Sequence, residues 1–286
     1  MPPASAAPRA PHAPRPALVG QELHLRYGRH PVVHGVSIAL TPGTVTALLG
    51  PNGSGKSTVL RSLARLHPLG EGEILLDGPE GARSAALLSA KELAKALTLF
   101  SQSRTSPQGL SVRDVVAFGR HPHRRRFAGL TDADRAAIDH AMELTGVSVF
   151  AARGVGELSG GEMQRVWLAS CLAQDTGIVL LDEPTNHLDL RYQIETLDLV
   201  RDLAEIHGTA VGIVLHDLDH AARIADQVIL LSAGHIHAAG AAGEVLTSEH
   251  LSDVYDIPID VTADPRSGRL RIEALGRRGI RVAAAV

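Results

Sequence analysis

The residues best suited to chemistry lie in one glycine-rich stretch. Residues 50–58, with the sequence GPNGSGKST, fit the phosphate-loop pattern G-x-x-x-x-G-K-[ST] at every defined position. Glycines let backbone N–H groups surround an anion, which makes a polyphosphate the natural guest. We expect Lys56 to reach the β- and γ-phosphates and Ser57 to ligate Mg²⁺. The alternative is a glycine-rich turn that matches the pattern by chance.

The segments on either side of this loop have the patterns that a phosphate loop needs. Residues 45–49 form an apolar run typical of a buried strand, and residues 57–66 carry apolar side chains on one helical face. The positive end of the helix dipole would point into the loop. This context favours nucleotide binding.

Polar side chains follow three other apolar runs. Residues 97–100 are followed by Gln102, residues 178–181 by Asp182 and Glu183, and residues 210–215 by His216. In open parallel α/β sheets the ligand binds beyond the carboxyl ends of the strands. The sequence therefore predicts that these side chains converge with Lys56 on one site.

Helical patterns replace the strand patterns at about residues 103–165. This insert closes with Ser159, Gly160 and Gly161, directly before an apolar helix. A helix start of this kind could contact a second anion, or it could be only a cap.

Antiparallel strands are indicated by the alternation of apolar residues that begins at Leu18. Tyr27 ends such a strand, where its ring could stack on a base or could be an ordinary, partly buried surface tyrosine. We expect residues 1–16, rich in proline and alanine, to be a disordered tail, residues 17–264 to form the domain, and residues 265–286 to be a polar tail.

Composition narrows the class of protein. The 286 residues carry a net charge of −3, which argues against a large nucleic-acid surface, and we read Arg120 and Arg124 to Arg126 as a solvated loop. One cysteine, Cys171, excludes an internal disulfide and fits a packed core. No apolar run approaches the roughly 20 residues that cross a bilayer.

His235 and His237 alternate along a strand without an acidic or cysteine partner at ligand spacing. We therefore expect both side chains to be exposed to solvent, and no metal other than Mg²⁺.

From about Leu18 to Asp260 the chain resembles the ATP-binding subunits of ATP-binding-cassette (ABC) transporters. The resemblance implies a P-loop NTPase α/β fold with a parallel-sheet core, an antiparallel β subdomain and a helical subdomain. The matching positions are the Walker A loop (Gly50, Pro51, Asn52, Gly53, Ser54, Gly55, Lys56, Ser57, Thr58), the glutamine loop (Gln102), the signature (Leu158 to Glu162), the Walker B strand (Ile178 to Asp182, then Glu183), the aspartate loop (Asn186 to Asp189), the switch histidine His216 and the adenine-stacking Tyr27. The signature departs from the commoner pattern at Glu162, where glutamine is more frequent.

What the resemblance implies is an ATPase that works as a homodimer. Ser57, Gln102 and Asp182 would position Mg²⁺, Glu183 would activate water, and His216 would contact the γ-phosphate. Ser159 and Gly161 would complete the ATP site of a second chain. The subunit would lie at the cytoplasmic face of the membrane, held there by a permease that works with an extracytoplasmic binding protein.

Three stretches look like importers of iron(III)-siderophores, haem and cobalamin, and the siderophore branch fits best. They are residues 119–123, residues 172–176, and residues 215–218 with Ala221 and Ala222. Haem and cobalamin remain alternatives. A soluble ABC ATPase outside transport is another: a DNA-repair ATPase would need a long coiled coil, which the heptad pattern does not support, and a translation factor usually has two cassettes in one chain.

Overall fold

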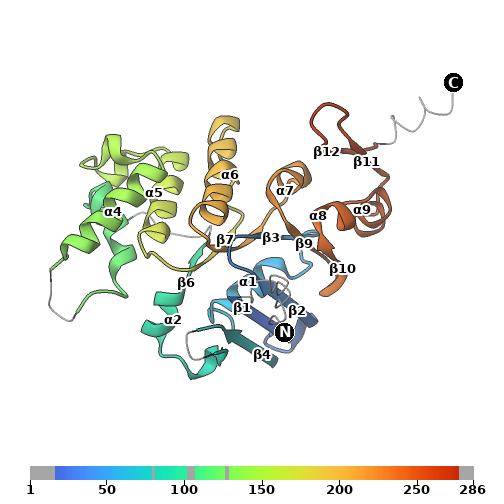
Figure 1. The fold of residues 1–286 in the computed structure, drawn as a ribbon, viewed down its shortest axis with the longest axis horizontal. Coiled ribbons are helices and arrows are strands. Elements are labelled where there is room, and N and C mark those ends of the chain that lie inside the picture. The colour runs from blue at the N-terminus through green and yellow to red at the C-terminus, as the bar shows by residue number, and fades with distance from the viewer. Residues whose placement is uncertain (1–16, 79–80, 102–106, 126–128, 277–286) are drawn as a thin grey trace, which may run out of the picture.

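A central six-stranded sheet organises the protein. The computed structural model describes residues 17–78, 81–101, 107–125 and 129–276. The sheet contains β3 (Val45–Leu49), β6 (Leu97–Phe100), β7 (Ile178–Asp182), β8 (Ala210–Val214), β9 (Gln227–Ser232) and β10 (His235–Ala241), in the order β10-β9-β3-β8-β7-β6 (Figure 1). All neighbours pair in parallel except β10, which runs antiparallel to β9. The predicted parallel core is confirmed.

A second, antiparallel sheet packs against one face of the central sheet through a helix. It contains β1 (Leu18–Tyr27), β2 (His30–Leu40), β4 (Glu71–Leu76) and β5 (Arg83–Ser84), in the order β2-β1-β4-β5. The helix is α1 (Lys56–Leu63), whose Leu60 and Leu63 are fully buried among residues of both sheets. η1 (Ala85–Leu87) and α2 (Ala90–Ala96) lead from this sheet back to β6. The predicted antiparallel subdomain is confirmed.

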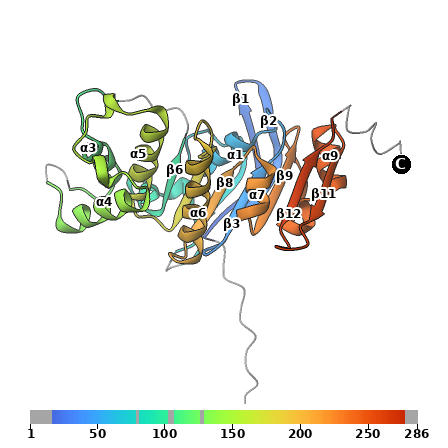
Figure 2. The ribbon, with the colours of Figure 1, turned by 90° about the horizontal axis from the view of Figure 1, so that it is seen from above.

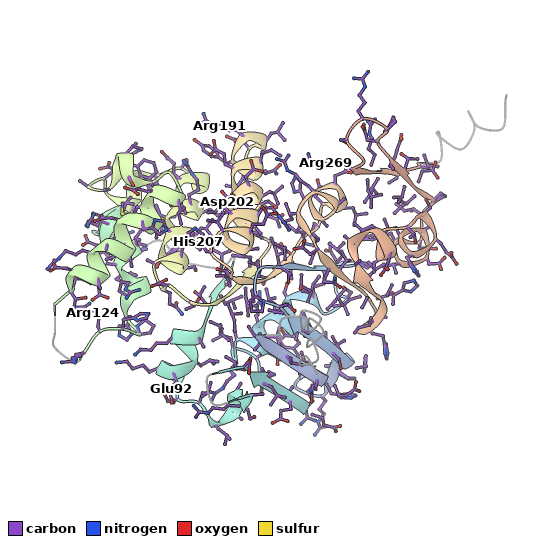
Figure 3. The ribbon with its side chains drawn as sticks, in the orientation of Figure 1. Glu92, Arg124, Arg191, Asp202, His207 and Arg269 are labelled. Carbon is purple, nitrogen blue, oxygen red and sulfur yellow. The ribbon has the colours of Figure 1, made fainter. Side chains whose placement is uncertain are left out.

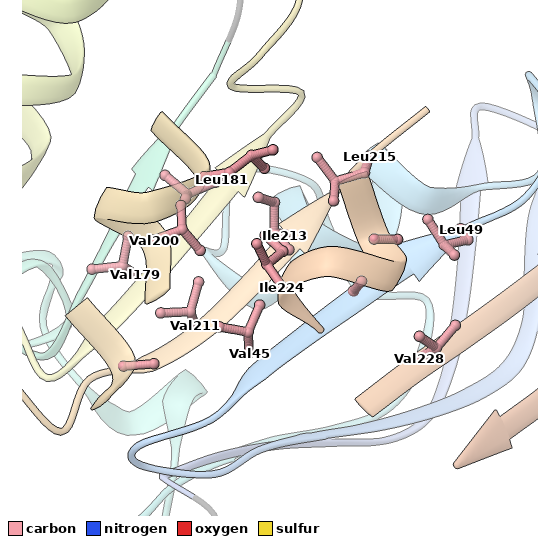
Figure 4. Close-up of a cluster of buried hydrophobic side chains, with 14 of the residues drawn as sticks. Val45, Leu49, Val179, Leu181, Val200, Val211, Ile213, Leu215, Ile224 and Val228 are labelled. Atoms are coloured by element: carbon pink, nitrogen blue, oxygen red, sulfur yellow. The ribbon is translucent and has the colours of Figure 1, made fainter. Parts of the chain in front are cut away.

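The opposite face of the central sheet is covered by α6 (Leu190–Glu205) and α7 (Leu218–Ile224). Val200 of α6 and Ile224 of α7 lie against Val211 and Ile213 of β8 (Figure 4). Burial on both faces explains why the strands of this sheet read as continuous apolar runs.

Helices form a separate lobe at one end of the molecule (Figures 1 and 2). It contains α3 (Val112–Val116), η2 (Ala117–Arg120), α4 (Asp132–Leu144), η3 (Ser148–Phe150), η4 (Val155–Glu157) and α5 (Gly160–Leu172). α4 begins with a capping box, in which Thr131 caps the helix and the Asp134 carboxylate accepts from the Thr131 N–H. Ala169 and Ala173 belong to the apolar cluster of this lobe, so its packing continues beyond the expected end at about residue 165.

Arg120 differs from its interpretation as part of a solvated basic loop. Its side chain is 6% exposed and donates to the Asp134 carboxylate at 2.8 Å and to the Ala173 carbonyl at 2.8 Å. Arg124 is exposed, as expected (Figure 3). The basic pattern therefore mixed one buried structural arginine with surface ones.

The chain continues in helices and strands beyond the β9–β10 hairpin. α8 (Ala242–Val245), α9 (Ser248–Tyr255), β11 (Ile259–Ala263) and β12 (Leu270–Ala274) follow it, and β11 pairs with β12. The expected boundary at Asp264 falls in the loop between these two strands. Leu270 and Ile272 pack on the main core, so this part of the polar segment is folded.

Charged side chains cover the periphery. Glu92, Arg124, Arg191, Asp202, His207 and Arg269 are all exposed (Figure 3). His235 and His237 are exposed and Cys171 is buried, as predicted. No helix in the described part of the chain is long and apolar enough to cross a membrane. The expected tail at residues 1–16 lies outside the described residues.

Candidate functional site

The phosphate loop joins β3 to α1, as the sequence predicts. Gly50, Gly53 and Gly55 all have positive φ, and a Cβ at Gly50 would lie 2.0 Å from the Leu231 carbonyl oxygen. Gly55 is the N-cap of α1, so no side-chain oxygen satisfies the first N–H groups of this helix. The loop therefore presents open N–H groups at the positive end of a helix.

Lys56 lies inside this loop and is only 5% exposed. Its Nζ donates to the carbonyl oxygens of Gly50 at 2.8 Å and Pro51 at 2.9 Å. Burial lowers the pKa of Lys56, and the charges of Glu183 and Asp182 partly offset that effect. The ammonium group is thus held inside the phosphate loop by two carbonyl oxygens, where it can bind a negatively charged group.

Ser54 supplies a direct test of whether the loop fits a phosphate. Its Oγ is buried and has no hydrogen-bond partner among the described residues. A buried hydroxyl without a partner is unfavourable, and a phosphate oxygen would satisfy it. Gly53 at the tip of the loop has open space beside it. The residues present therefore fit a phosphate group.

Asp182 lies at the carboxyl end of β7 and contacts α1. The Ser57 hydroxyl donates to its Oδ1 at 2.6 Å, and Arg61 forms an ion pair with its Oδ2 at 3.2 Å. Asp182 is 2% exposed. A hydroxyl and a carboxylate oxygen in contact beside a phosphate loop are the ligand types that Mg²⁺ prefers.

Glu183 follows at the mouth of the site with a backbone φ of 55°. Its Oε1 contacts His216 Nε2, and its Oε2 accepts from Asn186 Nδ2 at 2.5 Å. Its backbone N–H donates to Val214 at the end of β8. The carboxylate is therefore held from two strand ends, with only 18% of the side chain exposed. This arrangement can orient a water molecule and accept its proton.

No contact joins Tyr27 to this group among the described residues. Tyr27 ends β1, is 49% exposed, and packs its ring on His67 with centroids 4.5 Å apart. Gln102 lies outside the described residues, directly after Ser101 at the end of β6. The structure thus brings together Lys56, Asp182 and Glu183, with His216 beside them.

The signature stretch begins α5 in the helical lobe, apart from α1 (Figure 1). Ser159 is the N-cap: it accepts from the Glu162 N–H at 3.3 Å, and its own N–H and hydroxyl donate to the Glu162 carboxylate, both at 2.8 Å. These bonds from Ser159 lower the pKa of Glu162. Ser159 and Gly160 are exposed. The glutamate at this position therefore completes a capping box and leaves the helix start facing solvent.

Asp189 has a local role in the structure. Its Oδ1 accepts from the Tyr192 N–H at 3.0 Å and so caps α6. Gln164 of α5 donates to the Pro184 carbonyl at 2.6 Å, which ties the signature helix to the segment after Glu183. The segment that leads from Glu183 to the aspartate loop thus contacts the helical lobe.

Sequence reasoning missed Arg61, and it named Asn186 only as part of the aspartate loop, without its contact to Glu183. Arg61 lies four residues after Ser57, so both side chains project from one face of α1 toward Asp182. Asn186 lies three residues after Glu183 and reaches back to it across a turn. The helical spacing of Arg61 was a usable signal, whereas the contact of Asn186 depends on the turn geometry.

Comparison with known proteins agrees with this geometry. The family model for ABC transporters matches residues 33–186. The chain belongs to the ABC transporter ATP-binding family. The iron(3+)-hydroxamate import ATP-binding protein FhuC of Bacillus subtilis is 39% identical over 88% of this chain and 93% of its own length. The ferric enterobactin transport ATP-binding protein FepC of Escherichia coli is 40% identical, with coverages of 91% and 94%.

Solved structures agree as well. An ABC transporter of metal-chelate type in an inward-facing conformation superposes with a TM-score of 0.79 at 27% identity, over 92% of this chain and 99% of that one. A dimeric bacterial ABC transporter cassette gives 0.68 at 26% identity, over 79% and 98%. The predicted ABC ATPase fold is confirmed, and the chain is an ABC-type ATPase that binds nucleotide.

Proposed function

We propose that this ABC ATPase powers the import of an iron(III)-siderophore complex through a separate permease, at the cytoplasmic face of the membrane. The observation that carries the proposal is the likeness, at 39–40% identity over nearly the whole chain, to ATP-binding proteins named for ferric hydroxamate and ferric enterobactin. An extracytoplasmic binding protein would deliver the cargo.

Each residue of the site has a role in this proposal. Lys56 and the loop from Gly50 to Thr58 bind the phosphates. The Ser54 hydroxyl, which has no partner among the described residues, hydrogen-bonds to a phosphate oxygen. Ser57 and Asp182, in contact at 2.6 Å, hold Mg²⁺ together with Gln102. Mg²⁺ supplies charge neutralisation for the β- and γ-phosphates.

Glu183 carries the proton transfer. Asn186 and His216 fix the two oxygens of its carboxylate, which orients it toward an attacking water and lets it accept the proton. His216 also contacts the γ-phosphate. Tyr27 stacks on the adenine ring.

A homodimer completes the site. Ser159, Gly160 and Gly161 start a helix with an exposed N-terminus, which lies in the helical lobe and apart from α1 and its phosphate loop (Figure 1). We propose that this helix start contacts the γ-phosphate held by a second chain, and that Asp189 lies at the junction between the two.

Two of the three stretches that resemble siderophore importers, residues 119–123 and 172–176, pack against each other. Arg120 donates to the Ala173 carbonyl at 2.8 Å, and His123 Nε2 contacts the Gln174 carbonyl at 2.8 Å. Gln174 in turn donates to the carbonyls of Ala94 and Leu97. The two stretches therefore form one unit beside the end of α2 and the start of β6.

The test is uptake of a radiolabelled ferric siderophore by a strain that lacks this subunit. We expect uptake to be lost and growth to fail only when iron is scarce, and excess inorganic iron to restore growth. Complementation with Glu183→Gln should not restore uptake, whereas the wild type should. Normal siderophore uptake in the deletion strain would contradict the cargo.

Cobalamin is a second candidate, because a cobalamin import ATP-binding protein of Halobacterium salinarum is 40% identical over 86% of this chain. This chain spans 61% of that protein's length. Loss of cobalamin-dependent or haem-dependent growth in the deletion strain, with siderophore uptake intact, would favour these sister substrates.

A further inference from the structure

Two imidazole rings meet where α9 lies beside β10 (Figure 1). His237 of β10 and His250 of α9 are 13 residues apart in sequence, and His237 Nε2 lies 3.3 Å from His250 Nδ1. The rings are nearly perpendicular, at 85°, with centroids 5.3 Å apart. A strand and a helix are thus joined through two nitrogen atoms that can both ligate metal ions.

The distance between these nitrogens suits a shared metal ion. Two imidazoles bound to one tetrahedral Zn²⁺ at about 2.0–2.1 Å place their nitrogens about 3.3–3.4 Å apart. As a hydrogen bond, a separation of 3.3 Å is just beyond the usual range of about 2.7–3.2 Å for N–H donors. Imidazole is a preferred ligand of Zn, Cu, Fe and Ni.

We propose that His237 and His250 form a binding site for a divalent first-row transition metal ion that bridges β10 and α9. Each ring offers a lone pair to the ion, so the hydrogen that lies between them moves to the remote ring nitrogen or to solvent. In the part of the chain that the structure describes, no third histidine, cysteine or carboxylate joins the pair. Water fills the other coordination positions, and the site is open to exchange.

The histidine pair is open to solvent, and α9 connects it to the phosphate loop. His237 is exposed and His250 half-buried, so the ion can enter from solvent. α9 also carries Tyr255, whose hydroxyl interacts with the backbone of Gly50 in the phosphate loop. A metal ion at His250 therefore fixes the short helix that supports the first residue of this loop.

His235 provides a matched control on the same strand. It is exposed like His237, but its ring stacks on His34 at 4.7 Å with an angle of 17° between the planes. Removing it takes away one surface imidazole and leaves the proposed pair intact.

The test combines Zn²⁺ titration by calorimetry with thermal unfolding of the full chain in the presence of Zn²⁺ and then EDTA. We expect one Zn²⁺ site per chain and a rise in Tm that EDTA reverses. His237→Ala and His250→Ala should each weaken binding by about tenfold or more and abolish the rise. His235→Ala should keep both. Circular dichroism checks that each variant folds.

Electron paramagnetic resonance of bound Cu²⁺ adds a reading of the ligands. We expect coupling to two imidazole nitrogens in the wild type and to one in each single variant of the pair. The proposal is wrong if the wild type does not bind Zn²⁺, if His237→Ala and His250→Ala bind it unchanged, or if His235→Ala loses binding equally.

Discussion

The Lys56 side chain is held inside the phosphate loop, where its ammonium group can bind phosphate. Lys56 is buried and its pKa is lowered by that burial, so its charged form is less favourable in the folded protein than in the unfolded chain. At neutral pH this opposes folding, because the unfolded chain retains the ordinary, higher pKa of lysine. The positive charge of Lys56 thus does not stabilise the fold, and its favourable interaction is the one with a bound phosphate.

Lys56→Met tests that reading. ATP hydrolysis should fall by about 10²-fold or more, because the variant loses the ammonium group that stabilises negative charge on the phosphates. Tm should stay close to that of the wild type, because a desolvated charge is removed along with two hydrogen bonds. Phosphate release and thermal unfolding measured on the same sample check both parts. Near-normal hydrolysis would show that Lys56 has another role.

Tyr27→Ala should weaken ATP affinity by about 1–3 kcal/mol if the ring stacks on the base. The ring already packs against His67 and is half-exposed, so the fold should not depend on it. Fluorescent-nucleotide titration measures the affinity, and Tyr27→Phe, which keeps the ring, should bind as the wild type does. Equal affinity in Tyr27→Ala would make Tyr27 an ordinary surface tyrosine.

At the scale of residues, strand ends were predictable and turns were not. Asp182, Glu183 and His216 each follow an apolar run, and parallel strands bring such positions to one edge. The sequence did not show that Lys56 is buried, since a loop lysine is usually exposed. It also did not show that Asn186 holds Glu183, because that contact depends on the left-handed backbone at Glu183.

Among the elements, η2 and α5 approach each other closely in the helical lobe. A Cβ at Gly119 of η2 would lie 2.0 Å from the Ser170 carbonyl oxygen of α5. Only a residue without a side chain permits this approach, and it brings Arg120 to Ala173. The packing of η2 on α5 therefore depends on one glycine.

Gly119→Ala should destabilise the protein by about 1–3 kcal/mol through overpacking. Gly177→Ala is the control, because a Cβ there meets nothing within 4 Å and Gly177 does not have a positive φ. Urea unfolding of the two variants beside the wild type gives the comparison. Equal stability of both variants would mean that the lobe relaxes around the added methyl group.

Asp134 makes α4 sensitive to acid. Hydrogen bonds from Thr131, together with the Arg120 guanidinium, hold the pKa of Asp134 well below its usual range. A lowered carboxylate pKa stabilises the fold above the unfolded pKa, and that stability is lost as the pH falls toward the folded pKa.

Asp134→Asn should therefore be less stable than the wild type at neutral pH, with the difference shrinking between about pH 5 and pH 2. Thermal unfolding across that range measures it. Asp132→Asn, which changes an exposed neighbour, should follow the wild type at every pH. A constant difference between Asp134→Asn and the wild type would contradict the assigned cause.

Element boundaries were predictable where capping patterns were strong. The residues that begin at Ser89 and Thr131 have the spacing of capping boxes, and both boxes are present. Buried Arg120 was misread because three further arginines follow it closely, and only the tertiary structure supplies Asp134 as its partner. The β11–β12 hairpin was missed because its apolar residues are few and alternate with arginine and glutamate.

For the whole molecule, the ATP site is completed in the proposed homodimer. Glu183→Gln keeps the side-chain shape but cannot accept a proton, so hydrolysis should fall by about 10²–10⁴-fold while ATP still binds. We expect this variant to accumulate as an ATP-bound dimer. Size-exclusion chromatography with light scattering measures the oligomeric state with ATP, with ADP and without nucleotide. Glu73→Gln, at an exposed position of β4, is the control.

Ser159→Arg in the Glu183→Gln background should restore the monomer, because it places a bulky cation at the proposed junction. A Glu183→Gln chain that stays monomeric with ATP, both alone and in the assembled transporter, would contradict the composite site. Hydrolysis at the wild-type rate would contradict the role of Glu183.

The approach of η2 to α5 has a consequence for recombination between related transporters. Residues 119–123 and 172–176 are distant in sequence, yet Arg120, His123 and Gly119 each meet the backbone of the second stretch or of Ser170 just before it. A chimera that receives one stretch from another importer would join mismatched halves of one contact surface. We therefore expect the two stretches to be exchangeable only as a pair. A chimera with its crossover point between them should be unstable even when every ATP-contacting residue is retained.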